Sequence, residues 1–134
     1  MLSAQSIGFE KTYGDQLSNQ TGYSVQQTDD NGYIMLGGNN IFKTDLYGNL
    51  TWSKLFSGVG KWVEGTDSAY MFCGSRGGNI YVEKRDLSGA LIWNKSYGSV
   101  ATDDFGYSIQ GTYDGGFIIT GYIDSLNGVR GMYL

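Results

Sequence analysis

Apolar and polar residues alternate along short stretches of the chain, and Gly, Asn and Asp residues separate these stretches. A period of two residues indicates β-strands, while Gly, Asn and Asp favour tight turns between antiparallel neighbours. We therefore expect an all-β chain. The pattern predicts strands over 7–13, 23–28, 33–37, 40–45, 50–56, 62–66, 69–74, 79–86, 90–97, 107–112, 117–122 and 132–134.

The predicted strands follow a cycle of four that occurs three times. Residues 22–28 read GYSVQQT and residues 106–112 read GYSIQGT, while Phe9, Trp52 and Trp93 share one position of the cycle at spacings of 43 and 41 residues. The chain thus begins with a strand of the fourth type, continues with two complete units and ends within a third. Four antiparallel strands repeated at a fixed period are typical of β-propeller blades.

The repeat predicts a single domain over residues 1–134 that forms half of a propeller. It contains a strand over 7–13 that completes a last blade, a blade over 22–56, a blade over 61–97 and a partial blade over 106–134. Three blades are too few to close a ring, and a lone chain would expose two broad apolar faces. We therefore expect a six-bladed propeller formed by a homodimer, in which each N-terminal strand completes the last blade of its partner.

Composition excludes several classes of function. The net charge of −4 and the isoelectric point near 4.5 argue against a nucleic-acid partner. No run of 18 apolar residues predicts a membrane span, and the first residues lack the basic and apolar regions of a signal peptide. The chain contains no His, which is the commonest general base and metal ligand, so we expect no metal and no cofactor. Cys73 lies in an apolar run, which indicates a buried side chain.

The repeat units resemble those of secreted or surface-exposed β-propeller repeat proteins of bacteria and archaea. The resemblance rests on GYSVQQT at 22–28, DGGFIITG at 114–121, YVEKRDLSGALIWNKSYG at 81–98 and TDLYGNLTWSKLF at 44–56. It covers nearly the whole chain. It implies a β-propeller fold and an extracellular or cell-surface location, but it implies no activity, because a fold does not determine function.

A weaker likeness links the chain to quinoprotein propellers. The pattern D-x-x-G-x-x-x-W occurs at 45–52 and at 86–93. The distance between its Asp and Gly is one residue shorter than in the quinoprotein docking motif, so the likeness implies neither a quinone site nor a calcium site.

Two groups of residues that could bind a ligand have a structural interpretation. Trp52 and Trp93 could stack on sugars, but their identical register favours packing between adjacent blades. The sequence Asp-Asp-Asn-Gly at 29–32 resembles a fragment of a calcium loop, but it lacks the alternating ligands and distal Glu of such a loop. It is a favourable hairpin turn, and we interpret it as one.

The function that the sequence favours is a non-catalytic binding or assembly module, because no catalytic constellation is recognisable. The alternative is a lectin with sites at the blade loops, so the expected partners are a second copy, a glycan or a protein. A third hypothesis, a glycoside hydrolase, requires two carboxylates about 5–10 Å apart. The loops between repeats and between second and third strands share one face, where binding residues concentrate. The candidate contact residues on that face are Asp15, Asn39, Trp62, Arg76, Asp103, Asp124 and Arg130.

Overall fold

The computed structural model describes residues 8–14, 21–66, 68–98, 103–124 and 130–133. Within these ranges the chain forms nine strands and no helix, which confirms the all-β prediction. One antiparallel sheet contains β1 (Ser24–Gln27), β2 (Tyr33–Thr44), β3 (Leu50–Thr66), β4 (Ala69–Arg76), β5 (Asn79–Arg85) and β6 (Leu91–Tyr97), in that order. A second antiparallel sheet contains β7 (Phe105–Gly111), β8 (Phe117–Asp124) and β9 (Arg130–Tyr133).

β2 and β3 are longer than the sequence pattern predicts. β2 includes the predicted strands 33–37 and 40–45 up to Thr44, and it changes its pairing partner at Gly38, where φ is 57°. β3 includes the predicted strands 50–56 and 62–66, with Gly58 and Gly60 between them. A Cβ atom on Gly58 would lie 2.4 Å from the carbonyl oxygen of Ser75. These glycines therefore allow close packing within an extended strand and do not form a turn.

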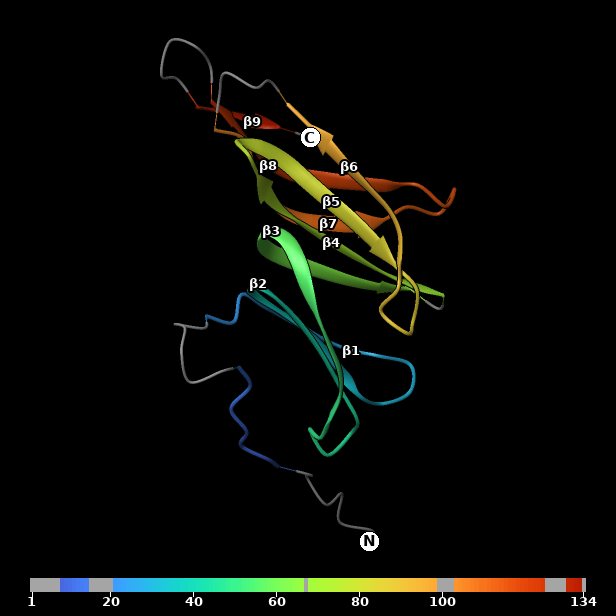
Figure 1. Cartoon of the computed structure of the whole chain (residues 1–134). Coiled ribbons are helices and arrows are strands. Elements are labelled where there is room, and N and C mark those ends of the chain that lie inside the picture. The colour runs from blue at the N-terminus through green and yellow to red at the C-terminus, as the bar shows by residue number, and fades with distance from the viewer. Residues whose placement is uncertain (1–7, 15–20, 67, 99–102, 125–129, 134) are drawn as a thin grey trace, which may run out of the picture.

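The registers and the core divide the chain into three layers, stacked along its length in Figure 1. The first layer contains β1, β2 and residues 50–55 of β3, which pair with residues 40–44 of β2. The second layer contains β4, β5, β6 and the part of β3 that pairs with β4, residues 59–66. The third layer is the sheet of β7, β8 and β9. The described strands of one chain do not close into a barrel or a ring.

The hydrophobic core lies between the layers as two clusters. One cluster joins the first and second layers, and the other joins the second and third. Side chains of β4 alternate between them, because Tyr70 and Phe72 belong to the first cluster while Met71 and Cys73 belong to the second. β4 is therefore buried on both faces, as its nearly continuous apolar sequence predicts. Burial also raises the pKa of the Cys73 thiol to about 12, so this side chain acts as a small apolar group.

Trp52 and Trp93 lie at the edges of these two clusters. Trp52 packs against the first cluster, and Trp93 packs against the second. The indole rings thus fill space between successive layers, which is the structural interpretation that the sequence favoured.

The N-terminal segment, residues 8–14, packs on the outer side of the first layer. The Phe9 ring lies 5.7 Å from the Tyr33 ring, and the Tyr13 ring lies 5.9 Å from the Phe42 ring, measured between centroids. Residues 8–13 are not a strand within this single chain, and the predicted strand over 7–13, which was expected to complete a blade of a second copy, stays a prediction. The physical reason is that a strand needs a neighbour for its backbone hydrogen bonds, and no described strand pairs with this segment.

Candidate functional site

Aromatic rings and one lysine gather at the edge of the molecule where the first strand of each layer begins. The Lys61 ammonium group lies 3.5 Å from the centroid of the Tyr23 ring and 5.6 Å from that of Phe105. The Phe105 ring stacks on Tyr107, with centroids 5.6 Å apart, and on Tyr122, with centroids 6.2 Å apart. We call these five residues the aromatic–lysine cluster. It combines side chains from all three layers.

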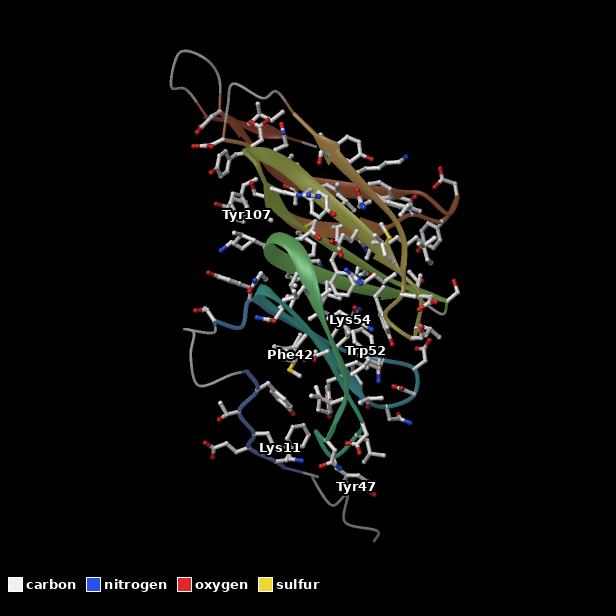
Figure 2. The ribbon with its side chains drawn as sticks, viewed as in Figure 1. Lys11, Phe42, Tyr47, Trp52, Lys54 and Tyr107 are labelled. Atoms are coloured by element: carbon white, nitrogen blue, oxygen red, sulfur yellow. The ribbon has the colours of Figure 1, made fainter. Side chains whose placement is uncertain are left out.

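The repeat explains how the chain assembles this cluster. Tyr23, Lys61 and Tyr107 each follow a glycine at the same position of the cycle, so the stacking of the layers brings them to one edge. Tyr23 is 44% exposed and Tyr107 is 50% exposed. The labelled Tyr107 side chain lies at this edge in Figure 2. Half-exposed aromatic rings beside an ammonium group offer flat apolar surfaces and polar tips to a ligand.

Three of the predicted contact residues flank the cluster. Trp62 follows Lys61 and is 39% exposed. Asp103 is exposed and lies two residues before Phe105, and Asp124 lies two residues after Tyr122. The chain positions of these three residues therefore agree with a site at this edge.

The third layer is held in place here by Asp104, which is fully buried. The Asp104 amide donates to the carbonyl oxygen of Gly78 at 2.8 Å, and the Asp124 amide donates to Asp104 Oδ1 at 3.1 Å. These bonds tie the start of β7 to the turn after β4 and to the end of β8. Asp104 therefore supports the backbone on which Phe105 and Tyr107 are displayed.

None of the other predicted contact residues in the described part of the chain is a member of the cluster, although Arg130 pairs with Asp124 across β9 and β8. Asn39 is exposed and its side-chain oxygen accepts a hydrogen bond from Asn40 Nδ2 at 3.1 Å. Arg76 is exposed, and its guanidinium carbon lies 5.2 Å from the centroid of the Tyr81 ring. Arg130 belongs to β9, and Asp15 lies outside the described residues. The aromatic–lysine cluster itself thus contains none of the seven predicted residues, and their role as contact residues stays a prediction.

Sequence reasoning missed the cluster itself. Tyr23 and Tyr107 could have indicated part of the cluster, because both are large aromatic residues at the same repeat position. Lys61 interrupts that series in the second unit, and Phe105 and Tyr122 approach it only through tertiary packing. Only the structure shows that side chains of three layers converge.

Among the hollows that the described residues line, three lie away from this cluster. One of about 550 Å³ lies between the N-terminal segment and the first layer. Another of about 200 Å³ lies between the first and second layers, beside Thr28, Thr66 and Tyr70. The third, of about 480 Å³, lies between the second and third layers, beside Thr112 and Phe117. The last two hollows occupy equivalent places in the repeat, where the first strand of a layer ends. The aromatic–lysine cluster lies at the other end of these strands, where they begin.

Asp30, which lines the hollow between the first two layers, is a structural carboxylate. Lys43 Nζ lies 2.7 Å from Asp30 Oδ2, and the hydrogen bonds from Lys43 and then Thr28 lower the pKa of Asp30 to about 2. Asp30 also accepts a bond from the Gly32 amide at 3.0 Å, and Asn31 has a positive φ of 63°. The prediction of a turn over 29–32 is therefore confirmed. Among the described residues no group of three or more Asp, Glu or Cys side chains has the arrangement of a metal site.

Comparisons with known proteins give a structural relative and leave function open. No protein-family model matches the chain, and no curated protein matches its sequence. Its structure is similar to the crystal structure of a protein of unknown function from Bacteroides caccae, with a TM-score of 0.57 and 10% sequence identity. The match covers 85% of this chain but 46% of that one, so the matched part spans less than half of the solved neighbour. In the described part of the chain, no helix has the length and apolar character needed to cross a bilayer.

Proposed function

We propose that this chain is a non-catalytic binding and assembly module whose three layers are blades of a β-propeller. The proposal is carried by one observation, the different burial of equivalent apolar residues in the repeat. Ile34, Met71 and Ile118 share one position of the cycle, on the side that faces the following layer. Ile34 is 0% exposed and Met71 is 5% exposed, but Ile118 in the third layer is 43% exposed.

The opposite end of the molecule shows the same difference. Val25, Val63 and Ile109 share the position that faces the preceding layer. Val63 and Ile109 are each 1% exposed, while Val25 in the first layer is 63% exposed. The two end faces therefore carry the residues with which neighbouring layers pack inside the chain. Apolar faces of this kind favour burial against a partner.

A second copy of the chain supplies both missing neighbours. The exposed face of the first layer carries the residue type with which the second and third layers contact the layer before them. The exposed face of the third layer carries the residue type with which the first and second layers contact the layer after them. Two copies joined at both ends give a six-bladed ring with no exposed end face.

The test of the assembly is the mass in dilute solution, measured by light scattering behind a sizing column. We expect twice the chain mass of 14.7 kDa. A stable and monodisperse monomer would contradict the proposal. The extracellular or surface location is proposed from the sequence resemblance alone, and fractionation of the cells that express the chain is its test.

The aromatic–lysine cluster favours a second candidate function, glycan binding. Exposed tyrosine rings can stack on the apolar faces of sugars while their hydroxyl groups and nearby carboxylates accept or donate hydrogen bonds. The test is a glycan array probed with the parent chain and with Tyr107→Ala. Tyr113→Ala is the matched control, because Tyr113 is fully exposed but lies in the turn between β7 and β8, away from the cluster. We expect Tyr107→Ala alone to lose binding, and no signal from the parent on any glycan would contradict this candidate.

A further inference from the structure

We propose that residues 8–14 form the fourth strand of the third layer in a second copy of the chain, pairing with its β9. The inference rests on the proposed assembly and specifies how the two copies join. It is based on contacts that residues 8–14 make with the first layer, because equivalent contacts occur between the first and second layers and between the second and third.

The first repeated contact joins an aromatic residue of a fourth strand to an aromatic residue of the next layer. Trp52 in the first layer lies 6.1 Å from Tyr70 in the second, measured between ring centroids. Trp93 in the second layer lies 5.6 Å from Phe117 in the third. Phe9 lies 5.7 Å from Tyr33 in the first layer. Because Tyr33, Tyr70 and Phe117 share one repeat position, Phe9 occupies the place of a fourth-strand aromatic in a layer that would precede the first.

The second repeated contact involves a turn glycine of the next layer. A Cβ atom on Gly89 would lie 3.1 Å from the Trp52 ring, and a Cβ atom on Gly48 would lie 2.5 Å from the Phe9 ring. The φ angles of Gly48 and Gly89 are 75° and 83°, so the two turns also share their backbone conformation. Each turn therefore receives one aromatic ring from the layer before it.

Equivalent turns also accept a hydrogen bond from a side chain of the preceding fourth strand. Trp52 Nε1 donates to the carbonyl oxygen of Leu87 at 3.2 Å, in the turn between β5 and β6. The Tyr13 hydroxyl group donates to the carbonyl oxygen of Gly48 at 2.8 Å, in the equivalent turn between β2 and β3. Residues 8–14 thus have the environment of a fourth strand on the side that faces the next layer, and no described strand of the chain pairs with them.

The third layer shows the complementary arrangement. Its described residues form three strands, and β9 pairs with β8 alone among the described strands. In the second layer, the strand equivalent to β9 is β5, which pairs with β4 on one side and with β6 on the other. Figure 1 shows residues 8–14 and β9 at opposite ends of the molecule. The segment cannot therefore reach β9 of its own chain, and a second copy is the occupant that supplies the matching sequence.

The internal repeat predicts the register of this pairing. In the second layer, Gly74 pairs with Tyr81, and Tyr81 pairs with Ser96. In the third layer, Gly121 pairs with Tyr133, so Tyr133 takes the position of Tyr81. Thr12 takes the position of Ser96, because Phe9 takes that of Trp93. We therefore expect Thr12 of one copy to lie opposite Tyr133 of the other.

Disulfide trapping tests this register. The double variant Thr12→Cys with Tyr133→Cys is oxidised gently and analysed by electrophoresis without reductant. Opposed residues of antiparallel strands have Cα atoms about 4.5–5.5 Å apart, which a disulfide can bridge. We expect most of the protein to become a covalent dimer. Cys73 does not interfere, because it is buried in the core.

The matched control is Thr12→Cys with Gly131→Cys, which moves one thiol two residues along β9. Its Cα atoms would lie about 7–8 Å apart, beyond the usual reach of a disulfide, so we expect about tenfold less covalent dimer. Amide hydrogen exchange of the unmodified chain gives a second readout, in which residues 8–14 should be protected in the dimer. A dimer by light scattering with no cross-link and no protection would overturn the strand exchange but not the assembly. A monomer would overturn both.

Discussion

Arg85 donates a hydrogen bond of 2.8 Å from Nε to Oε2 of Glu83, and both side chains are buried within the second layer. Arg85 also donates to the carbonyl oxygens of Leu55 and Gly89, each at 2.9 Å, and the amide of Ser57 donates to Glu83 Oε1 at 3.1 Å. The pair therefore binds the segment of β3 that leaves the first layer. Since every charged group has partners, we interpret Glu83 as a structural residue and not as a catalytic acid.

Replacing Glu83 with Gln should destabilise the fold by about 3–5 kcal/mol, because it leaves the buried Arg85 guanidinium group without a counter-charge. Urea unfolding monitored by tryptophan fluorescence measures the change. The double variant Glu83→Gln with Arg85→Met should recover part of the loss, since no unpaired charge remains. Equal destabilisation in the single and double variants would show that the charge pairing is not the cause.

The ion pair of Asp30 and Lys43 should make stability depend on pH in the acid range. The pKa of Asp30 falls from 3.8 to about 2 in the folded chain, chiefly because Lys43 and then Thr28 donate hydrogen bonds to it. The stabilisation is therefore present above pH 4 and is lost as the pH falls from 4 to 2. Asp30→Asn should lower stability by about 1 kcal/mol or less at pH 6, because its carboxylate is exposed and screened by solvent.

The difference between the parent and Asp30→Asn should shrink to a small fraction of its pH 6 value near pH 2, where the carboxyl begins to be protonated in the folded chain; urea unfolding at a series of pH values measures it. Asp29→Asn is the matched control, since it changes the neighbouring exposed carboxylate of the same turn. A difference between the parent and Asp30→Asn that persists unchanged at pH 2 would contradict the assigned pKa.

The strand order and the layers were largely predictable from the repeat. Phe9, Trp52 and Trp93 define the period, and the apolar residues of β4 predict burial on both faces. The continuity of β3 was not predictable, because Gly58 and Gly60 resemble turn residues in the sequence but serve close packing in the fold. Glycine has both uses, and only the approach of a neighbouring strand distinguishes them.

The candidate site was predictable only in part. Trp62, Asp103 and Asp124 were predicted because variable loops carry binding residues, and in the chain they lie beside residues of the cluster. Lys61 and Phe105 were missed, because they belong to different layers and meet only when those layers stack. Side-chain convergence of this kind depends on tertiary geometry that a linear pattern does not contain.

Replacing Trp93 with Ala should destabilise the chain by about 3 kcal/mol, near the lower end for large aromatic residues because its ring is half-buried. The loss follows from its packing against Phe117 and the second core cluster. Trp62→Ala is the matched control, since Trp62 is partly exposed and belongs to neither core cluster; we expect a change below about 1 kcal/mol. Thermal unfolding compares the two variants, and an unchanged Trp93→Ala would mean that Trp93 does not stabilise the fold.

The proposed assembly predicts that one charge on either end face should separate the copies. Ile118→Asp and Val25→Asp each place a carboxylate at a position that is buried in the two equivalent layers, where an unpaired charge is costly. Light scattering should therefore show monomer or aggregate for both variants. Ile92→Asp is the matched control, because Ile92 is 53% exposed but belongs to β6 of the second layer, which already has a layer on each side. This variant should remain a dimer. Dimers of equal stability for all three variants would show that the end faces do not meet, and a monomeric Ile92→Asp would show that the assembly uses a different surface.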